Sequence, residues 1–568
     1  MAAELEEQGF DLGHSNWFSL TRKDHATAAK QLKEKLEVLM TEWKAKDAQF
    51  IDKNFPANKT SLCKPSDNVE FSVSSWRRPK HVVVNNEDPA LEWSLFNHSK
   101  NKADVVQGKL ENCWAMTAMS LISTQPDLLD KIFVTKEYNR SGVYGMLLCL
   151  YGQWIEVIVD DLLPCDSAGC LVFGQAKRKQ LWVPLLEKAI AKLYGSYAAT
   201  ASGSVASGLH LFTGQAVEML ITGKECVSQP TYHRFHTKLR QAISEGMLVM
   251  CCADQKNIDA ATYAKVKLTK DHIYLMLNVE TIHQNKLFRL KDSWGTPSWS
   301  GNWSQGSQNW RDVPKEQMPI EGIGGSEDGI FWISYVDILV HFRDVGICYV
   351  RSDWYDYHLS SKLPCIPDTY FQGFRIDVAK DTFVDIHIQE ILQSPEALIN
   401  SQTEALLVLY DAQWKLIGSH FGELNNLVLT KKYLRSGHYY AFCFSHTKWQ
   451  KGEPVNYTLI CHSSEEVRMT VFDYPANMMT DILYNYIVAV GERVEAHKPL
   501  IRYTVESSFW WGRMLAVANY SDTNHYAVKL TTTSEENITC SRGKQTDDCI
   551  PPRHRLFLAK ICRLGKAK

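Results

Sequence analysis

A cysteine at the start of an apolar helical segment is the first residue of this sequence that could do chemistry. Cys113 follows the polar run Gln107–Asn112 and precedes an apolar stretch from Trp114 to Ile122. A thiol in the first turn of a helix faces unpaired backbone N–H groups and the positive end of the helix dipole, and both lower its pKa. An ordinary buried thiol is the alternative, because the chain has 15 cysteines and most buried thiols are inert.

A cysteine nucleophile needs a base, and the segment from Leu268 to Gly295 contains a candidate. Strand alternation places His272 on one face of a strand, and a turn near His283 would bring the chain back antiparallel to it. Asp292 on the returning strand would then lie at the same open end, where an acidic group could hold the imidazole in one tautomer. A structural histidine in a hairpin is the alternative.

Gln107 is the third residue of this candidate site. It lies six residues before Cys113. Its side-chain amide and the Cys113 backbone N–H could together stabilise the oxyanion of an acyl intermediate. Alone, Gln107 would be an ordinary loop residue, but the combination with Cys113 and His272 favours nucleophilic catalysis.

Several elements must position these residues. Residues 26–46 form an expected amphipathic helix, and we expect it to dock on the body of the protein, with a partner-binding helix as the alternative. Residues 47–202 are mostly helical in pattern, broken by an expected strand at 154–160. The small residues Ser202–Gly208 suggest a hinge, and the pattern beyond Gly208 shifts toward strands.

From Arg351 to the end, the sequence shows little convincing helix. Short alternating or apolar runs with turn signals between them are typical of antiparallel sandwiches. The length suits two modules, with a join near Ser463–Glu466.

Composition restricts the function classes. The chain has 568 residues, a net charge of −2 and a pI near 6.8, which gives no argument for nucleic-acid or anionic-membrane binding. It has no signal-peptide pattern and no apolar run of about 18 residues, so we expect it not to be transmembrane. The scattered, odd number of cysteines without a CxxC pair argues against a disulfide framework and favours a reducing, cytoplasmic compartment.

Three motifs, in this order, resemble those of the calpain cysteine proteases. "DVVQGKLENCW" resembles the family's Q-G-x-L-G-D-C-W, "DHIY" its G-H-A-Y, and "LKDSWG" its L-R-N-P-W-G. The resemblance extends from about Phe50 to Arg351. The remainder resembles the small-optic-lobes branch of the calpains, through "SDWYDYHLSSKLP" and "TDDCIPPRHRLFLAKI". No cysteine pairs of that branch's zinc fingers precede the protease, and no calcium-binding EF-hand loop closes the chain.

The resemblance implies an α+β fold. We expect a papain-like, two-lobed protease core with a helical lobe and a β-rich lobe, followed by two antiparallel β-sandwich domains. The expected domains are an N-terminal region with the amphipathic helix (1–46), a lobe with the catalytic cysteine (47–205), a lobe with the catalytic histidine (206–351) and two sandwiches (352–464 and 465–568).

The resemblance also implies roles. Cys113 would be the nucleophile, His272 the base and then the acid, and Gln107 the oxyanion donor. Asp292 stands where the family's asparagine orients the histidine, and Trp294 where a tryptophan shields that hydrogen bond from water. The expected reaction is limited cleavage of protein substrates through an acyl-enzyme, by an intracellular cysteine endopeptidase.

The sequence departs from the family at three places near the site. Asp292 replaces an asparagine, although a carboxylate can still accept from the imidazole N–H and favours the charged histidine. Asp271 replaces the glycine before His272. Glu111 and Asn112 replace Gly-Asp before the nucleophile, where the backbone could need the freedom of glycine.

The expected calcium ligands are also depleted. At the first site of the family Asp104 keeps an acid, but Gln180 stands where a glutamate is expected. At the second site only Asp328 remains acidic, because the other positions hold Ser298, Gln305 and Ile330. Calcium prefers carboxylate and carbonyl oxygens. We therefore expect no certain cofactor, a weak first calcium site and a lost second site.

Two function classes follow. One is an active protease with protein substrates. The alternative is a catalytically impaired calpain-like scaffold or regulator that acts through protein or lipid contacts of its β-sandwich domains. An exposed aromatic patch at "FWWGRM" (Phe509–Met514) would favour the second.

Overall fold

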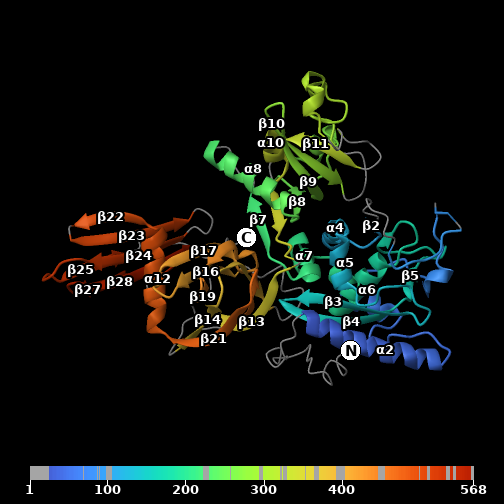
Figure 1. Cartoon of the computed structure of the whole chain (residues 1–568), viewed down its shortest axis with the longest axis horizontal. Helices are drawn as coiled ribbons and strands as arrows, with labels where there is room; N and C mark the ends of the chain where they lie inside the picture. The colour runs from blue at the N-terminus through green and yellow to red at the C-terminus, as the bar shows by residue number, and fades with distance from the viewer. Residues whose placement is uncertain are drawn as a thin grey trace. The chain divides into compact units, whose positions relative to one another are not determined.

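The computed structural model of the protein describes residues 25–568 apart from the segments 68, 86, 89, 97–104, 222–228, 256–257, 293–298, 320–322, 324–328, 352, 364–369, 392–402, 446–453, 498, 508–511, 532–537, 541–544 and 564–568. It divides into two compact units, the first ending at Arg351 and the second beginning at Ser352. Figure 1 shows helices gathered in the blue and cyan part of the first unit, and strands making up most of the orange and red second unit. Within the described residues, no helix combines the length and apolar character that crossing a membrane requires.

The first lobe of the first unit mixes helices and strands. Its elements are α2 (His25–Ala45), α3 (Lys59–Leu62), β1 (Ser75–Arg77), β2 (Val105–Val106), α4 (Cys113–Ile122), α5 (Pro126–Ile132), β3 (Val143–Leu150), β4 (Gln153–Asp160), β5 (Leu163–Cys165), β6 (Gln175–Ala176), α6 (Trp182–Tyr194) and α7 (Val205–Thr213).

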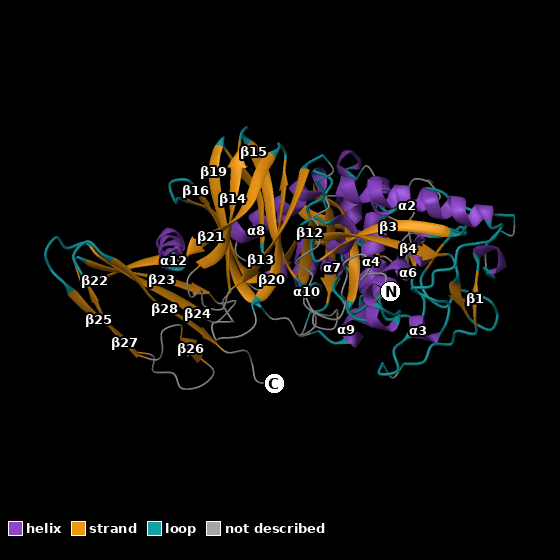
Figure 2. Cartoon of the chain, turned by 90° about the horizontal axis from the view of Figure 1, so that it is seen from below, coloured by secondary structure: helices purple, strands orange, loops and turns teal. Residues whose placement is uncertain are grey.

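The predicted amphipathic helix is α2, and it docks on the lobe. Leu32 and Leu36 are buried in a cluster with Val143 and Leu147 of β3. Figure 2 shows α2 running alongside the β3–β4 hairpin. Apolar residues at helical spacing thus produce a helix whose stability comes from this packing.

The strand β3 corrects the mainly helical pattern predicted for this lobe. Val143 and Leu147 face α2, while Tyr144, Met146 and Leu148 belong to the main cluster on the other side. A strand that is covered on both faces has an unbroken apolar sequence and lacks the alternation that identifies a half-exposed strand. The strand predicted at 154–160 corresponds to β4.

The predicted hinge at Ser202–Gly208 is wrong. The Ser204 hydroxyl accepts a hydrogen bond from the Ser207 N–H and caps the first turn of α7. A Cβ on Gly203 would lie 2.5 Å from the Trp114 ring, and one on Gly208 would lie 2.8 Å from Ala118 Cβ. The small residues therefore allow α7 to pack closely against α4.

The second lobe is built on a six-stranded sheet in the order β11-β10-β9-β8-β12-β7. Its elements are β7 (Val217–Ile221), α8 (Gln229–Ser244), β8 (Leu248–Ala253), α9 (Ala260–Lys265), β9 (His272–Ile282), β10 (Asn285–Asp292), β11 (Ile330–Ser334), α10 (Tyr335–His341) and β12 (Asp344–Cys348). The run GIFWISYVDILVHF looks like a strand throughout, yet its second half is α10, because the Ser334 hydroxyl accepts from the Asp337 N–H and starts a helix.

One apolar cluster runs through both the helical part and the six-stranded sheet of the first unit, while the papain-like two-lobed arrangement stays a prediction. It contains Trp114 of α4 together with Met250 of β8, Leu275 of β9 and Cys348 of β12. Trp114 directly follows the candidate nucleophile, and Leu275 lies three residues after the candidate base. The same packed core therefore carries both chemical groups.

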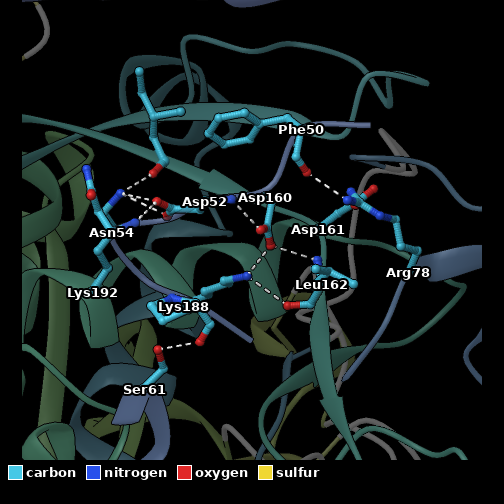
Figure 3. Close-up of polar contacts among 12 residues, drawn as sticks. Phe50, Asp52, Asn54, Ser61, Arg78, Asp160, Asp161, Leu162, Lys188 and Lys192 are labelled. Atoms are coloured by element: carbon cyan, nitrogen blue, oxygen red, sulfur yellow. Dashed lines mark hydrogen bonds and ion pairs between the residues drawn. The ribbon is translucent and has the colours of Figure 1, made fainter. Parts of the chain in front are cut away.

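A buried charge network fixes the N-terminal segment of the first lobe to β4 and α6 (Figure 3). Lys188 Nζ lies 2.5 Å from Asp160 Oδ1 and also donates to the Leu162 carbonyl at 2.8 Å. One turn further along α6, Lys192 Nζ lies 2.8 Å from Asp52 Oδ2. Because removing one partner of a buried ion pair leaves an uncompensated charge, these contacts hold α6 in one position.

The second unit begins with a β-sandwich. Its two sheets have the orders β13-β20-β15-β18 and β17-β16-β19-β14-β21 and enclose one apolar cluster. The strands are β13 (Tyr355–Leu363), β14 (Tyr370–Val378), β15 (Thr382–Glu390), β16 (Glu404–Asp411), β17 (Leu416–Glu423), β18 (Val428–Leu434), β19 (Gly437–Ser445), β20 (Val455–Ser463) and β21 (Val467–Pro475).

Two features differ from the predicted arrangement of this unit. The strand β21 pairs with β14 along its whole length, so it belongs to the first sandwich although the predicted join at 464/465 assigns it to the second module. The segment that follows is the helix α12 (Asn477–Val490), although little helix was expected. Its aromatic and β-branched residues resemble a strand in composition, but Leu483 and Ile487, four residues apart, are both buried in a core at helical spacing.

The helix α12 lies in a core shared by both β modules. This cluster contains Leu406 and Phe442 of the first sandwich, Ile487 of α12 and Met514 of the second module. The second module has sheets of order β22-β23-β24-β28-β26 and β25-β27. Its strands are β22 (Glu492–His497), β23 (Leu500–Ser507), β24 (Gly512–Asn519), β25 (Tyr526–Thr531), β26 (Ile538–Cys540), β27 (Gln545–Ile550) and β28 (Arg555–Arg563).

Candidate active site

Cys113 is the first residue of α4, as the sequence predicts. The carbonyl of Asn112 accepts from the Ala115 N–H at 2.9 Å and so begins the helix. Trp114 is buried in the lobe core, whereas the Cys113 side chain is exposed. The thiol therefore stands at the helix N-terminus with access to solvent.

The two residues before Cys113 do not need the conformational freedom of glycine. Glu111 is not among the described residues with a left-handed backbone, and Asn112 has φ −106°.

The pKa of the Cys113 thiol is raised, which corrects the prediction of a lowered pKa. Desolvation by the surrounding protein raises the pKa most, and the Glu111 carboxylate adds to this effect. The backbone N–H groups of Trp114 and Cys113 lower the pKa, as expected at a helix start, but they are outweighed. At neutral pH the thiol is therefore protonated, and it needs a base to remove the proton.

His272 and Asp292 lie together in the hairpin that the sequence predicts. His272 opens β9 and Asp292 closes β10, and the turn at His283 and Gln284 has φ values of 44° and 66°. Nε2 of His272 lies 2.9 Å from Oδ1 of Asp292, and both side chains are almost fully buried. The contact is established by the fold, while the catalytic roles of the two residues stay a prediction.

This contact defines which nitrogen of the imidazole can act as a base. A carboxylate only accepts hydrogen bonds, so Nε2 carries the proton in the pair with Asp292. Nδ1 is then the nitrogen that can take a proton from a thiol. The Tyr274 ring packs edge-on against the imidazole at a centroid distance of 4.9 Å and supports this orientation. Trp294, the expected shield, lies outside the described residues.

Gln107 is half-buried in the loop that precedes α4. Its Nε2 donates to the Leu110 carbonyl at 3.2 Å, and its Oε1 is buried without a hydrogen-bond partner among the described residues. A Cβ on the next residue, Gly108, would lie 2.3 Å from the backbone of Phe173, so only glycine fits there. The fold thus places the amide in the loop of the nucleophile, and its role as oxyanion donor stays a prediction.

Asp271 has a left-handed backbone with φ 56°, which explains why a glycine would suit this position. Aspartate is one of the few other residues that tolerate this conformation. Its N–H donates to the Ala253 carbonyl at 2.8 Å. A side-chain hydrogen bond with Asp254 raises the pKa of the exposed Asp271 carboxyl, and Arg343 forms an ion pair with Asp254 at 2.5 Å. A carboxyl pair therefore lies beside the candidate base.

Three of the positions at which the family resemblance implies calcium ligands are described, and the loss or weakening of the two sites stays a prediction. Gln180 is buried and donates its amide to the Lys177 carbonyl at 3.0 Å. Ile330 begins a strand and offers no side-chain oxygen, while Gln305 is exposed. Asp104, Asp328 and Ser298 lie outside the described residues.

One group near the nucleophile escapes the sequence analysis altogether. Glu187 of α6 is 2% exposed and accepts a hydrogen bond at 2.8 Å from the side-chain amide of Asn112, the residue before Cys113. In the sequence Glu187 lies within a helix of mainly apolar core residues. In the sequence, the signal that could have pointed to Glu187 is a charged residue at a helical position whose neighbours are apolar, since a fully buried carboxylate needs hydrogen-bond partners.

Comparison with known proteins connects these residues to one family. A family model described as "Calpain family cysteine protease" matches residues 50–349, which is 300 of the 568 residues and includes Cys113, His272 and Asp292. A second model, "Calpain-D-like, C-terminal domain", matches residues 486–567.

Individual relatives agree with this match. The chain is 32% identical over 310 residues to the calpain-type cysteine protease DEK1 of Arabidopsis thaliana, an overlap of 54% of this chain and 14% of the relative. It is 32% identical over 315 residues to the calpain-type cysteine protease ADL1 of Oryza sativa subsp. japonica, with the same coverage. It is 29% identical over 347 residues to the calpain-1 catalytic subunit of Gallus gallus, with 58% and 46% covered. The chain thus spans less than half the length of each of these relatives.

Proposed function

Because the chain belongs to the calpain family of cysteine proteases, we propose that it is an intracellular endopeptidase that makes limited cleavages in protein substrates. The observation that carries the proposal is the buried His272–Asp292 contact at 2.9 Å, in the same unit as an exposed Cys113 at a helix N-terminus. A nucleophile, a base and a group that orients the base are the parts that covalent catalysis by a thiol requires.

The reaction follows from these groups. His272 Nδ1 takes the proton of the Cys113 thiol while Asp292 accepts from Nε2, and the sulfur then attacks the peptide carbonyl. The Cys113 N–H and the Gln107 amide stabilise the oxyanion. The imidazolium returns its proton to the leaving amine, and water then hydrolyses the acyl-enzyme with His272 again as the base. The raised pKa of the thiol favours a first step in which a base, here His272, removes the thiol proton.

The first prediction is that Cys113→Ala abolishes cleavage of casein and of a fluorogenic peptide, because the acyl-enzyme forms on the Cys113 sulfur. The measurement is the initial rate for the full chain between pH 5 and pH 9, with and without calcium. Cys549→Ala is the matched control, since Cys549 is also exposed but lies in the second unit. Equal rates for the wild-type chain and Cys113→Ala under all conditions would contradict the proposal.

A second candidate function is a calpain-fold scaffold or regulator that acts through protein or lipid contacts of its β-sandwich modules. The raised pKa of Cys113 and the replacement of the family's asparagine by Asp292 favour it. Covalent labelling of Cys113 by an epoxide calpain inhibitor would argue against it. Exposure of the aromatic segment Phe509–Met514 would favour this second function. Its residues Phe509–Trp511 lie outside the described residues, and its last residue, Met514, is buried.

Two finer assignments are also proposals. Membership of the small-optic-lobes branch is supported by the two C-terminal motifs of the sequence, and the match of a calpain-D-like C-terminal domain to residues 486–567 is compatible with it. A cytoplasmic location is supported by twelve described cysteines that are free thiols, which suits a reducing compartment. Recovery of the protein only from secretory compartments during cell fractionation would contradict the second assignment.

A further inference from the structure

A buried carboxylate ties the residue before the nucleophile to the lobe. Glu187 Oε1 accepts from Asn112 Nδ2 at 2.8 Å, and Oε2 accepts from the Gly174 backbone N–H at 2.8 Å. All three groups are buried. Burial raises the pKa of Glu187 to about 7, and the hydrogen bonds from Asn112 and Gly174 oppose this rise because they stabilise the carboxylate.

The Gly174 N–H, which is the second donor to Glu187, belongs to the segment that supports the loop containing Gln107. Gly174 follows Phe173, whose backbone packs against Gly108, and the Lys109 N–H donates to the Val172 carbonyl at 2.9 Å. Gly108 and Lys109 directly follow Gln107. A single carboxylate therefore connects the start of α4 with the chain on which the Gln107 loop rests.

The contact also changes how α4 begins. An asparagine at this position normally caps the helix by accepting from an N–H of the first turn. Asn112 makes no such bond, because its amide nitrogen is directed to Glu187. Its Oδ1 is buried without a hydrogen-bond partner in the described part of the chain, which is unfavourable. The N–H groups of Cys113 and Trp114 instead act on the Cys113 sulfur and lower its pKa.

The helix that carries Glu187 is itself immobilised. The next residue, Lys188, is paired with Asp160, and Lys192 is paired with Asp52 (Figure 3). Glu187 therefore cannot follow a movement of the loop without breaking a buried ion pair. This makes it a rigid support for Asn112.

We propose that Glu187 is a positioning residue for the nucleophile: it holds the Asn112 side chain away from the helix N-terminus and so fixes the Cys113 peptide and its N–H groups for the thiolate. The inference rests on the proposed function of Cys113, and its test is chosen so that the two can fail separately. The reactive thiol itself is the readout, because its alkylation requires no substrate turnover.

The test compares the wild-type chain with Glu187→Gln, Asn112→Asp and the double variant. In Glu187→Gln the new NH₂ group faces one of the two donors, so the contact with Asn112 is lost unless the Asn112 amide turns over, and either outcome changes the orientation of the Asn112 side chain. In the double variant the carboxylate introduced at position 112 accepts from the glutamine NH₂, and the glutamine oxygen accepts from the Gly174 N–H. The double variant therefore restores both contacts and keeps the same net charge.

The rate of Cys113 alkylation by iodoacetamide is followed by peptide mass spectrometry, with Cys549 as an internal standard in the same sample. We expect Glu187→Gln to slow alkylation of Cys113 about tenfold, because the displaced N–H groups of Cys113 and Trp114 stabilise less of the reactive thiolate, and to leave Cys549 unchanged. We expect the double variant to recover the wild-type rate within about twofold. An unchanged Cys113 rate in Glu187→Gln, or no recovery in the double variant, would overturn the inference.

Thermal unfolding and peptide cleavage complete the experiment. If Glu187→Gln does not fold, the folded double variant decides between the outcomes. Alkylation of Cys113 at the wild-type rate supports the role of the contact between positions 187 and 112, and alkylation about tenfold slower contradicts it. Alkylation that depends on Glu187 in a chain that cleaves no peptide would refute the proposed protease and leave the positioning role intact. Cleavage that is insensitive to Glu187→Gln would refute the positioning role alone.

Discussion

At the scale of single residues, the chemistry depends on the orientation of individual side chains, which the surrounding residues determine. Cys113 and the His272–Asp292 pair could be located from the sequence, because short local motifs and strand alternation fix them. The direction of the Asn112 side chain could not be, because it depends on Glu187, which lies 75 residues later in the chain. The sequence also does not predict the raised pKa of Cys113, because the helix start that lowers the pKa is visible in the sequence, whereas the burial that outweighs it is a property of the folded chain.

A prediction at this scale concerns Asp271. We expect Asp271→Gly to raise the melting temperature of the first unit by about 2 °C, because glycine has no penalty at φ 56°. The gain should be larger at pH 7 than at pH 4. The raised pKa means that the folded carboxyl pair binds a proton more tightly than the unfolded chain does, so its contribution to stability is present at low pH and is lost as pH rises.

Asp271→Asn is the matched control for this experiment. Asparagine also tolerates the left-handed backbone but carries no charge, so it should reproduce the pH-dependent part of the gain without the part from backbone relief. Differential scanning calorimetry at the two pH values measures both parts. A larger gain at pH 4 than at pH 7 would show that the Asp254–Asp271 contact does not act as described.

At the scale of elements, one-sided burial made the prediction easiest. The helix α2 has a single apolar stripe and was correctly expected, whereas β3 is apolar on both faces and was not. The helix α12 was missed because two β modules contact it, so its apolar residues form no narrow stripe. Periodicity is therefore least informative where an element is covered on all sides; α4, which is also buried all round, was predicted from the capping-type Asn112 and the apolar run that follows it.

The shared core around α12 makes a prediction. Ile487→Ala should destabilise the second unit by about 3 kcal/mol, because Ile487 is fully buried and its removal leaves a cavity. Protection against hydrogen exchange should fall in β16 and β24 together, since both strands contribute to this core. Val488→Ala, at an exposed position of the same helix, should have an effect within about 0.5 kcal/mol. Loss of protection in only one module would contradict a shared core.

At the scale of the whole molecule, the chain combines a calpain protease unit with a second unit made almost entirely of strands. The α+β composition and the sandwich character of the second unit followed from the sequence. The position of β21 did not, because strand pairing across a sandwich is a long-range property that a linear pattern does not encode.

Calcium dependence is the prediction that belongs to this scale. We propose that the second family site is lost and the first is weak, because Ile330 cannot ligate a cation and the Gln180 amide donates to a backbone carbonyl. Isothermal titration of the full chain with calcium should therefore show no tight binding, and magnesium serves as the control titrant. Two tight, calcium-specific sites would contradict the proposal.

The position of α12 between the two β modules has a consequence for any shortened chain. A chain that stops at Pro475 would retain every strand of the first sandwich but would leave Leu406, Val408 and Phe442 open to water. An apolar patch of this kind promotes aggregation. We therefore expect that exchange of the first sandwich alone, or its release by a protease, would expose the same apolar patch. Recombination and proteolysis alike would have to keep the first sandwich together with the module that follows it.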